Sequence, residues 1–90
     1  MKKPQHRVHY KKSVEKELRK VPKVQLALLI KKISSLATNP FPAGAVCLQG
    51  ISNLYRIRHA NYRVIYQVSN DELIILVVKV GHRKEVYRSI

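Results

Sequence analysis

Apolar and polar residues alternate along the C-terminal part of the chain, from Leu54 to Tyr87. Alternation with a period of two is typical of a β-strand that is buried on one side. Two pairs of turn-forming residues, Ala60-Asn61 and Asn70-Asp71, interrupt this pattern. Because two-residue loops are the commonest hairpin connections, the stretch is predicted to form three successive antiparallel strands and a basic tail.

The first turn determines which residues face one another across the first hairpin. The predicted opposite pairs are His59 with Tyr62, Arg58 with Arg63, Ile57 with Val64, and Arg56 with Ile65. Because side chains alternate between faces, one face is predicted to carry Arg56, Arg58, Arg63 and Ile65, and the other Ile57, Val64, Tyr66 and Val68. Like charges placed opposite each other destabilise a sheet, so we infer that the arginine-bearing face binds something anionic.

The N-terminal part begins with a short alternation from Arg7 to Tyr10, which predicts another strand. From Lys12 the apolar residues recur at helical spacing, with Ser13 as the expected N-cap. The apolar positions of this short amphipathic helix are Val14, Leu18 and Val21.

Pro22 is expected to separate the first helix from a second one, because proline fits the first turn of a helix but not its interior. The apolar positions of the second helix are Leu26, Leu29, Ile30, Ile33 and Leu36. This helix is expected to end near Thr38, and residues 39–50, which contain two prolines and two glycines, to form an irregular connection.

Together these elements predict an α+β fold in a single domain that spans residues 1–90. An N-terminal strand and a helical hairpin precede a three-stranded antiparallel sheet, and both helices pack on one sheet face. That face is predicted to carry Ile57, Val64, Tyr66, Leu73, Ile75 and Val77. The face with the arginines is expected to stay open. Gly81 is expected to interrupt the last strand, so that residues 82–88 bend back across the sheet.

The charge of the chain restricts its partners. Eighteen Lys and Arg against five Asp and Glu give a formal net charge of +13, which points to nucleic acid or an acidic protein. No secretory signal is evident, and no apolar run reaches the ~20 residues of a membrane span, so a cytoplasmic protein without a membrane partner is expected. The single Cys47 cannot form an intramolecular disulfide, and no His has nearby ligands at metal-binding spacing, so neither a metal nor another cofactor is expected.

Aromatic residues are interspersed among the basic ones in the segments Tyr55-Arg56-Ile57-Arg58, Tyr62-Arg63 and 82–88. Cations neutralise phosphates while rings stack on unpaired bases, so this mixture suits single-stranded nucleic acid. Tyr55, Tyr62 and Tyr66 share the predicted core face. Tyr87 lies in the charged tail, which has no apolar stripe, so a functional role is expected for it rather than a place in the core.

The segments LYRIRHANYRVIYQV and LVVKVGHRKEVYR resemble the RelE branch of the RelE and ParE toxin superfamily, and the order of elements agrees over essentially the whole chain. The resemblance implies an endoribonuclease that cleaves mRNA in the ribosomal A site and is silenced by a cognate antitoxin. Such an antitoxin is expected to bring acidic and apolar residues to the helical hairpin or to the basic face.

The resemblance also implies a site made of Arg56, Arg58, Arg63, Arg83 and Tyr87, to which the basic tail adds His82, Lys84 and Arg88. The predicted catalytic residues are Arg58, Arg63, Arg83 and Tyr87, and the predicted substrate-binding residues are Arg56, His82, Lys84 and Arg88. The best-studied relatives have lysines where this chain has Arg56 and Arg58. The guanidinium group of arginine is too weak an acid to release its proton. These two arginines are therefore expected to orient and neutralise a phosphate, while Tyr87, or alternatively His82, takes the proton of the 2′-hydroxyl.

Two other functions remain open at this point. A ParE-like inhibitor of DNA gyrase would need no catalytic residues, although its relatives generally lack the tail arginine and tyrosine together. A non-catalytic RNA-binding module would use the same basic and aromatic surface without cleaving RNA.

Overall fold

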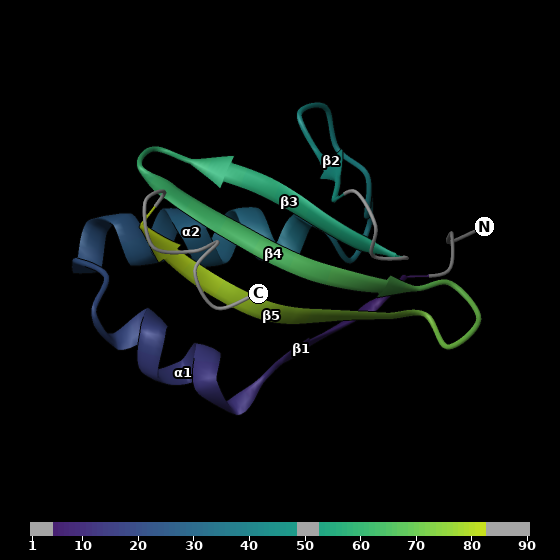
Figure 1. The fold of residues 1–90 in the computed structure, drawn as a ribbon, viewed down its shortest axis with the longest axis horizontal. Helices are drawn as coiled ribbons and strands as arrows, with labels where there is room; N and C mark the ends of the chain where they lie inside the picture. Colours follow the sequence, from purple (N-terminus) through teal and green to yellow (C-terminus); the bar gives the residue numbers. More distant parts are fainter. Residues whose placement is uncertain (1–4, 49–52, 83–90) are drawn as a thin grey trace.

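The computed structural model describes residues 5–48 and 53–82, and both helices lie on one side of a single sheet (Figure 1). The elements are β1 (Arg7–Tyr10), α1 (Lys12–Arg19), α2 (Lys23–Ser35), β2 (Val46–Cys47), β3 (Leu54–His59), β4 (Tyr62–Ser69) and β5 (Ile74–His82). The α+β class and the placement of the helices are as predicted.

The sheet has five strands in the order β1-β5-β4-β3-β2, one more than the four predicted, which were an N-terminal strand and three strands after the helices. The N-terminal strand β1 joins the sheet at one edge, where it pairs in parallel with β5. At the other edge β2 pairs with β3 inside the connection that was expected to be irregular. This strand was missed because it is only two residues long and both side chains are exposed, so it has no apolar periodicity.

The core lies between the helices and one sheet face, as predicted. Its fully buried side chains include Val14, Leu29, Ile33, Leu36, Val64, Tyr66, Ile75 and Val77. The Tyr66 hydroxyl donates a hydrogen bond of 2.7 Å to the Pro40 carbonyl. Burial, with a smaller effect of neighbouring Tyr55, raises the pKa of Tyr66 to about 12. Tyr66 therefore stays protonated and ties the connection after α2 to the sheet.

The first hairpin has the predicted register at every pair, and the second turn differs. Strand β4 ends at Ser69 and pairing resumes only at Ile74, so the connection has four residues rather than the predicted Asn70-Asp71. Asn, Asp and Glu disfavour strands, and β5 therefore starts at the first β-branched residue after them. Leu73 was assigned to the core, but it is 36% exposed and has a φ of 55° in this turn.

Two helix ends also differ from the prediction. The N-cap of α1 is Lys11 rather than Ser13, and no side chain caps the helix. The Lys11 N–H still donates to the Val77 carbonyl, at 2.9 Å, so the chain remains in the sheet until the helix begins. The second helix α2 ends at Ser35 rather than near Thr38. The Ala37 carbonyl, just beyond this end, accepts a 2.8 Å hydrogen bond from the His6 N–H, which ties the turn after α2 to the chain before β1.

Candidate functional site

The arginines predicted to converge do so on the sheet face opposite the helices. Arg58 on β3 is paired directly with Arg63 on β4, and Arg56 is paired with Ile65. We call Arg56, Arg58 and Arg63 the arginine face. On the far side of Arg63, its partner on β5 is Gly81, so β5 continues through this glycine to His82 instead of being interrupted there. Gly81 contributes no side chain beside Arg63.

The three arginines differ in exposure. Arg58 is exposed, whereas Arg56 and Arg63 are half-buried. The Nε atom of Arg63 is buried and has no hydrogen-bond partner among the described residues. A buried donor without an acceptor costs about 1–3 kcal/mol. An anion bound at the arginine face would supply that acceptor.

The arginine-bearing side of the sheet was expected to stay open, but part of it is covered. Ile65 is fully buried and Leu54 is 7% exposed, and Leu48 and Val78 pack against them. A register shift between Ile65 and Tyr66 brings Val78 into this second apolar cluster. Arg58 and Arg63, next to the β3–β4 turn, lie beyond the cluster and form the polar end of the face.

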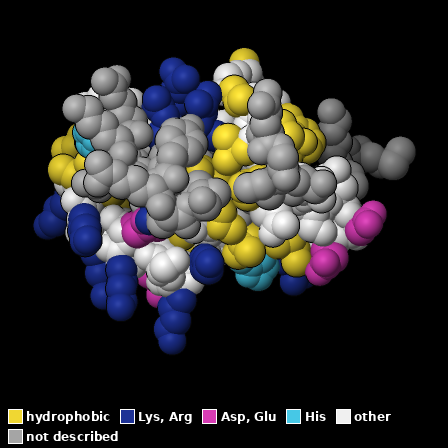
Figure 2. All heavy atoms as spheres, in the orientation of Figure 1, with side chains coloured by type: hydrophobic (Ala, Val, Ile, Leu, Met, Phe, Trp, Pro, Cys, Tyr) yellow, Lys and Arg dark blue, Asp and Glu magenta, His cyan; other side chains and the backbone are white. Residues whose placement is uncertain are grey.

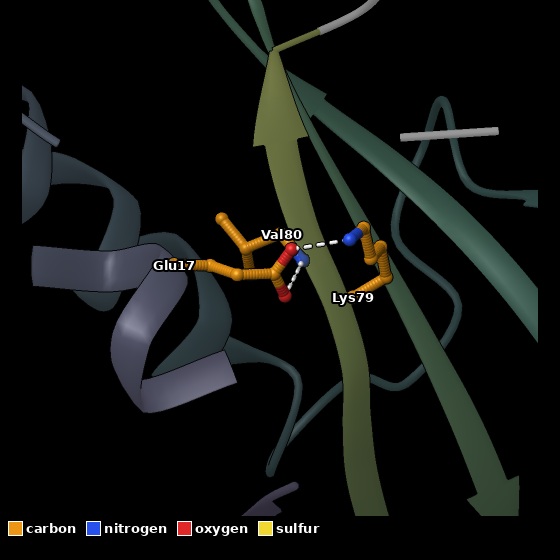
Figure 3. A network of polar contacts seen from close by, with 3 residues as sticks. All are labelled: Glu17, Lys79 and Val80. Atoms are coloured by element: carbon orange, nitrogen blue, oxygen red, sulfur yellow. Dashed lines mark hydrogen bonds and ion pairs between the residues drawn. The ribbon is translucent and has the colours of Figure 1, made fainter. Parts of the chain in front are cut away.

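Lys79 adds a fourth cation opposite Ile65, but its charge is already neutralised. Its Nζ atom lies 2.6 Å from a Glu17 carboxylate oxygen, and the other oxygen of Glu17 accepts a hydrogen bond of 3.2 Å from the Val80 N–H (Figure 3). Glu17 thus joins α1 to the edge of β5 beyond the last residue paired with β1. Because of this ion pair, Lys79 is not counted among the cations of the candidate anion site.

His82 lies on the other side of the sheet from the arginines. It is paired with Tyr62, and the two rings meet edge to face with centroids 6.2 Å apart. His59 contacts the Gln25 side-chain oxygen through Nε2 at 3.0 Å and links β3 to α2. Neither histidine faces the same side as Arg58 and Arg63.

The predicted tail residues Arg83, Lys84, Tyr87 and Arg88 lie outside the described residues. Within the described part of the chain, no three His, Cys, Asp or Glu side chains come together in a group that could hold a metal ion. None of the helices that the structure describes is both long and apolar enough to cross a membrane.

Sequence reasoning missed one cation at the site, Lys32 of α2. Its Nζ donates a hydrogen bond to the Arg58 carbonyl, and it lines a pocket together with Arg56 and Arg58. Lys32 is one of two adjacent exposed lysines on α2, and nothing in the helical pattern distinguishes it from Lys31. Only the packing of α2 against β3 brings it to the arginines.

Comparison with known proteins identifies the family. A sequence profile described as ParE toxin of the type II toxin-antitoxin system parDE matches residues 8–87. A candidate RelE1 toxin of Methanocaldococcus jannaschii is 33% identical over 85 residues, which are 91% of this chain and 94% of the relative. A candidate RelE-like toxin protein of Escherichia coli is 35% identical over 81 residues, which are 88% of this chain and 84% of the relative.

Solved structures agree with the sequence matches. The archaeal RelE-RelB complex of Pyrococcus horikoshii contains a chain that superposes with a TM-score of 0.80 at 30% identity, covering 91% of this chain and 99% of that chain. Sequence and fold therefore lead to the same assignment. The chain belongs to the RelE/ParE superfamily of toxins from type II toxin-antitoxin systems.

Proposed function

We propose that this toxin is an endoribonuclease that cleaves mRNA in the ribosomal A site and thereby inhibits translation. The observation that carries the proposal is the direct pairing of Arg58 with Arg63 beside a buried Arg63 Nε that lacks an acceptor within the described chain. Like charges placed opposite each other are destabilising in a sheet that serves only as a scaffold. A bound phosphate would make both features favourable.

The reaction that fits such a site is attack of an RNA 2′-hydroxyl on the adjacent phosphate. The P–O5′ bond breaks as the new P–O2′ bond forms, and the leaving O5′ takes up a proton from water, which leaves a 2′,3′-cyclic phosphate and a 5′-hydroxyl. Charge builds up on the phosphorane oxygens, where fixed guanidinium donors stabilise it. Arg63 and Arg83 hold the phosphate, and Arg58 and Arg56 neutralise the developing charge.

The proton of the 2′-hydroxyl needs an acceptor, and Tyr87 takes this role in the proposal. The cations of the proposed site would favour a phenolate and so lower the energy required to form it. His82 was the alternative acceptor, and its register on the Tyr62 side of the sheet argues against it. His82, Lys84 and Arg88 contribute to RNA binding around the site. A ribosome supports catalysis because it can orient the RNA for in-line attack where the enzyme has no strong base.

A translation extract tests this function. The chain is added with and without intact ribosomes, the 5′ ends of the messenger are mapped, and their chemistry is determined. New ends with a 5′-hydroxyl are expected only in translated regions, and Arg83→Ala should not produce them. Tyr87→Phe should abolish cleavage while RNA binding is retained. Cleavage by Tyr87→Phe at the parent rate would remove Tyr87 from the mechanism.

The competing function is inhibition of DNA gyrase by a ParE-like toxin, and the matching profile carries the ParE name. It predicts loss of gyrase supercoiling activity in a purified assay and no new ends on the messenger. The same two assays identify a non-catalytic RNA-binding module, which would leave both gyrase and messenger intact.

An antitoxin partner is proposed on the same basis, since the P. horikoshii relative was solved as a RelE-RelB complex. The surface of this chain calls for a partner with acidic and apolar residues. Val24 and Leu28 lie one turn apart on α2 and are 73% and 47% exposed, and lysines flank them along the helix. A helix or strand of an antitoxin that covers them would bury apolar area and neutralise charge.

A further inference from the structure

A pocket of about 360 Å³ lies at the outer edge of β3, beyond the point where β2 stops pairing. Helix α2, the connection around Gly44 and strand β3 form its walls. Its charged lining residues are Lys32, Arg56 and Arg58. Figure 2 shows Lys and Arg side chains gathered on the edge of the molecule above β3.

Among the residues that the structure describes, no acidic side chain lines this pocket. The acidic residues in the described part of the chain are Glu15, Glu17, Asp71 and Glu72, and none of them lines this pocket. The first two lie on α1, and the other two lie in the turn between β4 and β5. The pocket therefore has a positive potential that a small anion can lower.

Lys32 is held in place at this pocket. Its Nζ donates to the carbonyl of Arg58, which lies in the part of β3 that β2 does not pair. An ammonium group has three donors, and this bond uses one of them. The others can bind an anion in the pocket while the carbonyl fixes the position of the side chain.

The wall formed by the connection leaves space at Gly44. Gly44 has a φ of +91°, and a Cβ placed there would contact nothing within 4 Å. A 3.0 Å hydrogen bond from the Ala45 N–H to the Pro42 carbonyl closes the turn around it. The glycine is thus required by the backbone conformation of the turn, and the pocket beside it stays accessible.

We propose that this pocket binds an RNA backbone phosphate next to the scissile one, with Lys32 as a positioning residue. The inference rests on the proposed ribonuclease function. Arg56 and Arg58 belong both to the pocket and to the arginine face. One RNA strand can therefore run along these cations from the arginine face to the pocket, which a single acidic side chain cannot do. Fixing two successive phosphates sets the direction of the strand for in-line attack.

Binding of a short single-stranded RNA tests the proposal. The RNA carries a 2′-deoxy sugar at the cleavage position so that binding is measured without cleavage. Lys32→Gln is expected to weaken binding about tenfold. It should also reduce the slope of log affinity against log salt by about 0.7, the value for one phosphate contact on a single strand.

Lys31→Gln is the matched control, because Lys31 is the adjacent exposed residue of α2, carries the same charge and does not line the pocket. Lys32→Arg should retain binding. The phosphates next to the cleavage position are then replaced one at a time by neutral methylphosphonates. At one position this replacement should weaken RNA binding by the parent but not by Lys32→Gln. Equal effects of Lys31→Gln and Lys32→Gln, or no such position, would overturn the proposal.

The outcome is separable from that of the proposed function. If the chain cleaves translated messenger but Lys32→Gln binds RNA like the parent, the pocket assignment is wrong and the ribonuclease stands. If the chain never cleaves RNA while one methylphosphonate position depends on Lys32, the phosphate pocket stands without the catalytic function.

Discussion

At the scale of single residues, the pairing of Arg58 with Arg63 is a feature that works against stability. The two guanidinium groups repel each other, and the Arg63 Nε is buried without an acceptor in the described chain. A residue that lowers stability and lies beside the proposed reacting phosphate should show opposite effects on folding and on activity.

We therefore expect Arg63→Gln to slow cleavage about 100-fold or more, because it removes one donor to the phosphorane. The free energy of unfolding should stay within about 0.5 kcal/mol of the parent or rise, since like-charge repulsion is relieved. Single-turnover cleavage and urea unfolding measure the two effects. Arg19→Gln, at an exposed position of α1, is the control for a lost positive charge. Destabilisation by more than about 1 kcal/mol would instead indicate a structural role.

At the scale of elements, each exposed sheet edge near the β3–β4 turn is capped by a charged side chain of a helix. Glu17 of α1 accepts from the Val80 N–H at the β5 edge, and Lys32 of α2 donates to the Arg58 carbonyl at the β3 edge. Both strands extend beyond their short outer neighbours, β1 and β2, and leave backbone groups without a strand partner. Such edges can pair with other chains unless they are covered.

The Glu17 cap can be tested by stability. Glu17→Ala removes both the acceptor for the Val80 N–H and the ion pair with Lys79. The side chain of Lys79 is 25% exposed and that of Glu17 is 19% exposed. We expect the free energy of unfolding to fall by about 1–2 kcal/mol, and by less in Glu17→Gln, which keeps an acceptor oxygen. Urea unfolding measures this. Glu15→Ala, exposed on the same helix, should have little effect, and an equal loss in that variant would contradict the cap.

At the scale of the whole molecule, charge is the dominant property. The net charge of +13 opposes compaction, and the apolar core has to overcome that repulsion. Two of the acidic residues, Asp71 and Glu72, lie in the turn between β4 and β5, at the opposite end of the sheet from the arginine pair (Figures 1 and 2). Asp71 and Glu72 thus lie far from the arginine pair and do not neutralise it.

Sodium chloride should therefore stabilise the free toxin, because screening weakens its self-repulsion. The melting temperature is expected to rise steadily from low to high salt. The affinity for an acidic antitoxin should fall over the same range, since screening also weakens attraction between the partners. Thermal melts and calorimetric titrations measure the two trends. A melting temperature that falls with salt, or an antitoxin affinity that does not change, would contradict this account.

Local patterns predicted much of the fold and part of the site. The Ala60-Asn61 turn sets the register of the first hairpin, and alternation then places Arg58 against Arg63. The second turn was misplaced because Asp71 and Glu72 lengthen it, and Ser13 was misassigned as a cap because pairing with β5 fixes Lys11. Each error occurred where a contact distant in sequence, or a poor strand former, overrode the local pattern.

By itself the sequence determined the periodicities, and through them which arginines share a sheet face and which side chains form the main core. Those properties depend on neighbours a few residues apart. Only the tertiary structure decided that β1 lies parallel to β5, that His82 lies away from the arginines and that Lys32 reaches Arg58. Lys32 and Arg58 are 26 positions apart in the chain, and Arg7 and its partner Ile74 on β5 are 67 positions apart. No local spacing of residues encodes such contacts.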